Sequence, residues 1–276
     1  MEEISQDKAK SFADRVSELA QSAFKERFVA SYLMGSLARG GFSAIASDID
    51  CGIIIKSPLS NADQDIIGSI SKEIEKYKGD LTIHVSIFWG SIRSVNGEED
   101  GGRYPPFDRF DLISHAKLIA GDDVRQFLHT PTQKELEIAS MEFALRRFAK
   151  EEGIDDFKKP SRILKKGVVE ITKTVLWPVR FIFILRTGKV AGNDVSVKYF
   201  KDNFSGHAVD LVSEAYKWRS VRLPPDKEVL ELLENSLVPL YEICINIYVK
   251  RLEEYGEKDL VEEINLWLNK ITSQKA

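Results

Sequence analysis

The amino-acid sequence predicts an α+β protein of two parts: a small mixed-sheet domain over residues 1–130, followed by an all-α helical-bundle domain over residues 131–276. Two observations predict this division. Up to about residue 130, short apolar runs alternate with segments of helical periodicity, and Gly, Ser or Pro separates them. From Gln133 onward, almost every segment has the apolar spacing of a helix. The length of 276 residues fits two domains, because a domain typically spans roughly 100–200 residues.

The first domain is expected to contain two helices and three strands. Apolar residues spaced three and four apart predict helices over residues 4–25 and 61–78. The apolar runs FVASYLM (28–34) and DIDCGIIIK (48–56) predict buried strands. The segment DLTIHVSIFW (80–89) alternates apolar and polar residues, which predicts a third strand with one polar face. Such a face in an otherwise apolar sheet is expected to border something hydrated.

Two segments of the first domain are rich in Gly and Ser and are expected to be loops. Residues 35–47 hold three glycines and three serines, which predicts turns rather than a regular element. Residues 90–108 form a polar, Gly-rich loop that ends in Tyr-Pro-Pro. The second domain is expected to be helical over 133–151, 161–187, 194–203, 206–219, 226–254 and 257–273.

Composition excludes several classes of protein. Lys and Arg total 39 and Asp and Glu total 43, for a formal charge of −4. A nucleic-acid coat or a polybasic membrane module needs a positive field, so both are disfavoured. Cys51 and Cys244 form no CxxC pair, which disfavours a disulfide framework and a Cys-based zinc site. A soluble protein of the reducing cytoplasm is expected, with no membrane partner, because the apolar stretch 175–185 is too short to span a bilayer.

One constellation predicts chemistry: Gly35-Ser36, eleven intervening residues, then Asp48-Ile49-Asp50. A Gly-Ser turn after a strand offers backbone N–H groups and a hydroxyl to a phosphate, with no Cβ in the way. Two aspartates at i and i+2 of a strand point to the same face. Such a pair is costly unless a divalent cation neutralises it, and hard oxygen ligands suit Mg²⁺ that also binds phosphates. Together these parts are suited to metal-assisted phosphoryl or nucleotidyl transfer.

Each part taken alone has an ordinary explanation. A Gly-Ser pair is usually a simple turn, and an Asp-x-Asp sequence is usually a solvated strand end. Their combination favours function, because both parts adjoin expected strands. In addition, Asp48 and Asp50 open an apolar strand, CGIII, where two charges need a reason.

These residues also carry a resemblance to a known family. The segment GSLARGGFSAIASDIDCGIII resembles the signature of the polymerase-β-type nucleotidyltransferase superfamily. The order of elements, with a helical C-terminal domain, resembles its small-molecule branch, which includes the aminoglycoside adenylyltransferases. A second segment, RFIFILRTGKVAGND (180–194), is similar to a helix end of the streptomycin and spectinomycin adenylyltransferases.

The resemblance implies roles for residues of the motif. Gly35 and Ser36 would bind the triphosphate of ATP or another nucleoside triphosphate. Asp48 and Asp50 would be catalytic and would hold two Mg²⁺ ions that bridge the phosphates. The 1–130 domain would then be the nucleotidyltransferase domain.

The resemblance extends to two arginines, each with an alternative. Arg39, in the same loop, would steady phosphate oxygens, or it is simply a solvated side chain. Arg180 would reach the nucleotide from the helical domain, or it is a snorkelling or core-paired arginine on an apolar helix.

The general base stays open between two residues of the expected third strand. The family places an acidic residue there to take the proton of the acceptor hydroxyl. Asp80 begins the segment, and this position resembles the arrangement in the aminoglycoside enzymes, which favours Asp80 as the base. His84 lies in the middle, where many relatives carry the aspartate, and a neutral imidazole could serve as the base. Alternatively, Asp80 is a turn residue and His84 a hydrogen-bonded filler.

The function that the resemblance implies is Mg-dependent transfer of a nucleoside monophosphate, most simply AMP from ATP, to a hydroxyl of a small acceptor, with release of pyrophosphate. One alternative is a toxin-type enzyme that modifies a protein partner. Another is a nucleotide-binding regulatory module with little turnover. The acidic balance disfavours a nucleic-acid acceptor, and the sequence leaves the oligomeric state open.

Overall fold

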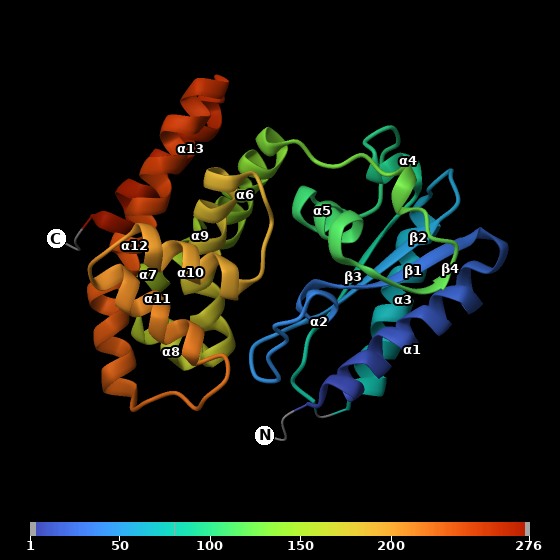
Figure 1. The fold of residues 1–276 in the computed structure, drawn as a ribbon, viewed down its shortest axis with the longest axis horizontal. Coiled ribbons are helices and arrows are strands. Elements are labelled where there is room, and N and C mark those ends of the chain that lie inside the picture. The colour runs from blue at the N-terminus through green and yellow to red at the C-terminus, as the bar shows by residue number, and fades with distance from the viewer. Residues whose placement is uncertain (1–3, 80, 274–276) are drawn as a thin grey trace. The chain divides into compact units, whose positions relative to one another are not determined.

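A computed structural model describes residues 4–79 and 81–273 (Figure 1). Contacts divide the chain into two compact units, Met1–Pro131 and Thr132–Ala276. We call them the sheet unit and the helical unit. The elements of each unit are described separately below.

The sheet unit is built on a mixed β-sheet, which in the described residues has four strands in the order β3-β2-β1-β4. Strands β1 (Phe28–Met34) and β2 (Ile49–Ile55) are antiparallel, as are β1 and β4 (Lys117–Gly121). Strand β3 (Val85–Gly90) runs parallel to β2. A mixed sheet of this kind confirms the α+β prediction.

Helices cover both faces of the sheet (Figure 1). Helices α1 (Gln6–Phe24) and α3 (Asn61–Lys78) pack on one face, where β1 and β2 contribute Leu33 and Ile53 to the core. The other face carries Tyr32, Met34 and Phe88, which pack against Leu112 of a helix, α5 (Pro106–His115). The polar residues of the candidate site lie on this second face.

Local signals explain where the first helices begin. Ser5 caps α1 by accepting a hydrogen bond from the N–H of Lys8 at 3.1 Å. Ser60 and Asp63 form a reciprocal capping box at the start of α3. The expected helices over 4–25 and 61–78, and the strands over 28–34 and 48–56, are therefore confirmed to within two residues at each end.

Other expectations for the sheet unit were wrong. The third strand begins at Val85 rather than at residue 80, because β2 begins at Ile49 and offers no strand partner to the residues before Val85. The 35–47 loop contains a short helix, α2 (Gly35–Arg39), which ends at Gly40, where φ is +95°. The expected loop over 90–108 contains α4 (Ile92–Val95) and the first residues of α5.

The helical unit has, among the described residues, eight α-helices, and α9 (Val168–Thr187) packs against five of the others. One expected helix is shorter than predicted, and another is divided. The first ends at Phe148, and Gly167, at a φ of +90°, separates the second into two. The remaining helices are α6 (Gln133–Phe148), α7 (Glu151–Lys158), α8 (Ser161–Lys166), α10 (Asn193–Asn203), α11 (His207–Lys217), α12 (Asp226–Tyr255) and α13 (Lys258–Thr272).

Two buried tyrosines join α12 to α9. The hydroxyl of Tyr241 donates to the carbonyl of Thr174 at 2.8 Å, and that of Tyr248 donates to the carbonyl of Phe181 at 2.7 Å. The first bond satisfies the carbonyl of Thr174, four residues before Pro178, whose ring lacks an N–H to donate within the helix. In the part of the chain that the structure describes, no helix has both the length and the apolar character needed to cross a membrane.

Candidate active site

The sheet register brings the two halves of the sequence motif together. Asp50 lies opposite Met34 on β1 and opposite Ser86 on β3. Gly35 follows Met34 directly, so the turn after β1 lies beside the start of β2. Asp48 precedes Asp50 by two positions, which places both carboxylates on one face of extended chain. Both aspartates are half-buried.

Gly35 and Asp50 are in close contact. Gly35 has a φ of +66°, a conformation that residues with a Cβ rarely adopt. A Cβ placed at Gly35 would lie 2.0 Å from Oδ2 of Asp50, far inside a van der Waals contact. The carboxylate therefore occupies the space that any other residue at position 35 would fill.

Serine hydroxyls hold the connection between β1 and β2 in a compact form. The hydroxyl of Ser36 donates to that of Ser47 at 3.2 Å, and the Ser47 oxygen also accepts from the N–H of Ser43 at 2.9 Å. Because Ser47 directly precedes Asp48, these bonds tie the Gly-Ser turn to the residue before the aspartate pair. Sequence spacing predicts no such link.

A third carboxylate, Asp111 of α5, contacts the same turn. The N–H of Gly35 donates to Oδ2 of Asp111 at 2.6 Å, while Arg39 forms an ion pair with Oδ1. The Nδ1 of His115 lies 3.4 Å from the same Oδ1. Burial by itself raises the pKa of Asp111, but hydrogen bonding from His115, the charge of Arg39 and the Gly35 N–H outweigh it and hold the pKa below its usual value. Asp111 is thus a buried anion beneath the turn.

Arg39 is not the solvated side chain of the alternative interpretation, which is wrong. Its side chain is 14% exposed. The Nε is buried and has no hydrogen-bond partner among the described residues. Leaving a buried donor unsatisfied typically costs about 1–3 kcal/mol, so the guanidinium keeps a capacity to bind a further acceptor. Its role toward phosphate stays a prediction.

His84 lies next to the aspartate pair on the sheet. Its carbonyl accepts the N–H of Ile49 at 2.9 Å, and the register of β2 and β3 sets it beside Asp48. The imidazole is exposed and belongs to the face that carries Asp50 and Ser86. Asp80, the other candidate base, lies outside the described residues.

The two aspartates fit a magnesium ion by the chemistry of their donor atoms. Asp48 and Asp50 offer hard carboxylate oxygens from one face, half-exposed, next to a residue that has no side chain. Mg²⁺ is usually bound through one or two carboxylates, with water and substrate phosphates completing its shell. Over residues 4–79 and 81–273, no group of three or more His, Cys, Asp or Glu side chains could hold a metal ion.

Arg180 belongs to the helical unit and lies on α9. Its guanidinium carbon is 4.5 Å from the centre of the Trp177 ring, a distance typical of a cation–π contact. Its expected contact with a nucleotide stays a prediction.

Sequence reasoning missed Asp111 because the signals that mark it are weak. The segment PFDRFDLISH begins with Pro at its first helical position, a favourable start for a helix. Within such a helix, an aspartate on the apolar side is a rare pattern that indicates a buried partner. The partner itself is 76 residues away in the chain, beyond any local pattern.

The fold can be compared with those of known proteins. No family model and no curated protein matches the sequence. Among solved structures, the chain is similar to the spectinomycin adenyltransferase AAD(9) from Enterococcus faecialis, whose crystal structure contains ATP and spectinomycin. The TM-score is 0.61 at 15% identity, over 84% of this chain and 99% of that one. The likeness shows that the protein has the fold of that adenyltransferase, a sheet-bearing part followed by a helical part.

Proposed function

We propose that the protein is a Mg-dependent nucleotidyltransferase that moves a nucleoside monophosphate, most simply AMP from ATP, to a hydroxyl of a small acceptor and releases pyrophosphate. The observation that carries the proposal is the contact of the Asp50 carboxylate with Gly35. It joins an acidic pair to a turn suited to phosphate, as the chemistry requires.

Each residue of the site has a role in this proposal. The hydroxyl of Ser36 and the backbone of the turn bind phosphate oxygens, and Arg39 adds a positive charge. Asp48 and Asp50 hold Mg²⁺, which when bound neutralises the phosphates and makes the α-phosphorus more electrophilic. Asp50 lies on strand β2 and Asp48 directly precedes that strand, and strands position groups more precisely than loops do.

The acceptor must lose a proton as its oxygen attacks the α-phosphorus. The exposure of His84 on the face of the aspartate pair supports its imidazole as the base that takes this proton. Asp80 is the alternative base. Pyrophosphate leaves on the side opposite the attacking oxygen.

The class of acceptor rests on the structural likeness. The similar adenyltransferase was crystallised with a small molecule, spectinomycin, together with ATP. This supports a small acceptor over a protein or a nucleic acid.

Incubation with labelled ATP, GTP, CTP and UTP, Mg²⁺ and a panel of small acceptors tests the proposal by pyrophosphate release. Release should disappear in Asp48→Asn and Asp50→Asn and on chelation of Mg²⁺. Asp65→Asn is the matched control, because Asp65 is an exposed carboxylate on α3, which covers the other face of the sheet.

Two results would contradict the enzymatic proposal. If both aspartate variants still release pyrophosphate, Asp48 and Asp50 do not have the roles proposed for them. Tight triphosphate binding without release, across the whole panel, indicates the nucleotide-binding module instead.

A further inference from the structure

We propose that Asp111 is a positioning residue of the candidate active site, which fixes the Gly35 turn and orients Arg39 toward the bound triphosphate. The inference deepens the proposed function and rests on it. It concerns a residue that the sequence motif does not include.

The position of Asp111 is rigid. Helix α5, which carries it, is anchored on the sheet by Leu112, which is fully buried in the core of that face. Asp111 itself is 4% exposed. A carboxylate on a helix that is packed in this way can hold a short turn at a fixed distance from the sheet.

The two oxygens of Asp111 bind the two ends of α2. Oδ2 accepts the N–H of Gly35, the first residue, and Oδ1 pairs with the guanidinium of Arg39, the last. A helix of five residues has little stability of its own, so contacts from outside must fix it. Asp111 supplies one such contact at each end.

The pairing leaves Arg39 able to bind a second anion. Asp111 engages Nη1, while Nε is buried and has no partner among the residues that the structure describes. A guanidinium has five N–H donors in a planar fork, so one carboxylate contact does not saturate it. A phosphate oxygen is the acceptor that the proposed function brings to this turn.

A double-mutant cycle tests the proposal. Asp111→Asn, Arg39→Met and the double variant are compared with the wild type for KM and kcat with the triphosphate and for binding of a fluorescent ATP analogue. Each single change should raise the KM about 10-fold or more, as expected for a lost charged hydrogen bond. The double variant should be no worse than Arg39→Met alone, because an Asn oxygen can still accept the Gly35 N–H and the lost charge of Asp111 acts through Arg39.

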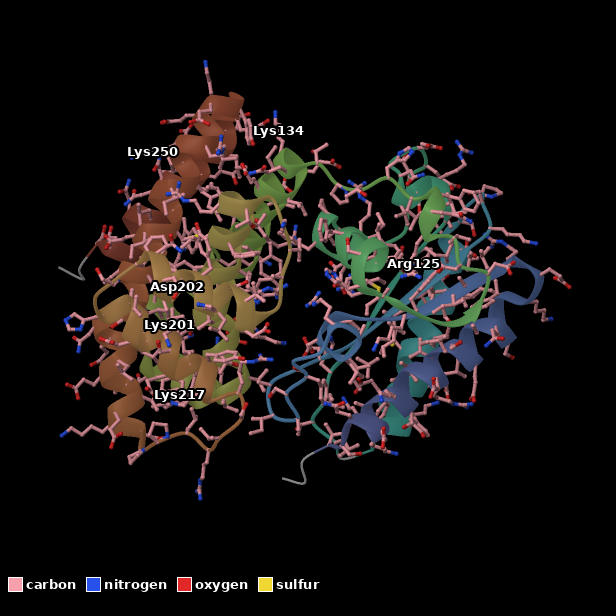
Figure 2. All side chains as sticks on the ribbon, viewed as in Figure 1. Arg125, Lys134, Lys201, Asp202, Lys217 and Lys250 are labelled. Atoms are coloured by element: carbon pink, nitrogen blue, oxygen red, sulfur yellow. The ribbon has the colours of Figure 1, made fainter. Side chains whose placement is uncertain are left out.

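A control separates positioning from general stability. Asp123 is also paired with an arginine, Arg125, which is labelled in Figure 2, and it accepts from the hydroxyl of Tyr32 at 3.2 Å. The adjacent Asp122 bonds Val29, near the start of β1, whereas the site lies at its other end. Asp123→Asn should lower the melting temperature and leave the KM unchanged.

If Asp111→Asn does not fold, Asp111→Glu replaces it in the cycle. The longer side chain keeps the charge but displaces the carboxylate, so the same non-additivity with Arg39→Met is expected.

The outcomes separate the two proposals. Additive changes in KM, or a lower melting temperature with unchanged KM, overturn the role of Asp111 while pyrophosphate release by the wild type stands. If the wild type binds no triphosphate, the proposed function fails, and the role of Asp111 fails with it.

Discussion

The carboxylate of Asp50 occupies the space where a side chain at Gly35 would begin, 2.0 Å from the position of a Cβ. This contact joins the turn directly after strand β1 to the start of strand β2. It makes position 35 intolerant of every residue but glycine, for reasons of both φ and space.

Gly35→Ala should therefore lose stability and activity together. The positive φ alone costs alanine about 1–2 kcal/mol, and the clash must also displace Asp50. A displacement of about 1 Å at a reacting centre can cost about 100-fold in rate, so pyrophosphate release should fall at least that far. Gly41→Ala is the control, since its φ is +79° but no atom lies within 4 Å of the added Cβ. Equal losses in both variants would contradict the role of the contact.

The stability that Asp111 contributes should depend on pH. Its folded pKa lies below the usual value of 3.8, so the contribution is full above that value and is lost as the pH falls through the folded pKa. Asp111→Asn should cost about 3 kcal/mol at pH 7, as for removal of one member of a buried ion pair, and less near pH 2. Urea unfolding at the two pH values measures this difference. A cost that is the same at both would show that the charge contributes nothing.

Separate substitutions should identify the general base. If His84 takes the acceptor proton, His84→Asn should lower kcat about 100- to 10,000-fold with little change in triphosphate affinity. His129→Asn, an exposed histidine whose N–H bonds Asn96, should have no effect. A normal kcat in His84→Asn together with a large loss in Asp80→Asn would assign the base to Asp80.

Removal of the hydrogen bond from the Tyr248 hydroxyl to the Phe181 carbonyl should lower the stability of the protein without changing its activity. Tyr248→Phe leaves the carbonyl of Phe181 without this donor in a fully buried place and should cost about 1–2 kcal/mol in denaturant unfolding. Tyr216, which is 37% exposed, gives a matched control that should lose less than about 0.5 kcal/mol. A similar loss in both would mean that the bond adds nothing.

Elements with strong periodicity and clear stop signals could be predicted from the sequence. Strand β1 ends where Gly35 interrupts the apolar run, and α3 begins at the Ser60 capping box. The pairing of β2 with β1 also follows from the motif, because both of its halves adjoin strands. The Gly-Ser turn and the Asp-x-Asp pair therefore come together as their spacing predicts.

The rest depends on contacts between distant residues. The alternation of apolar and polar residues over 80–89 fits an extended chain whether or not another strand pairs with it. The start of β3 at Val85 is set by its pairing partner Ile49, the first residue of β2. Strand β4 is short and half-exposed, so its sequence, KLIAG, has no alternating pattern. The contact of Asp111 with Gly35 arises from tertiary packing alone.

Both native cysteines, Cys51 and Cys244, are buried, and burial raises the pKa of each thiol. Since the thiolate is the reactive form, a maleimide dye will label neither at neutral pH while the protein is folded. A cysteine introduced at an exposed position such as Thr82, two residues before His84, is then a selective attachment point for a fluorophore in the otherwise unmodified chain.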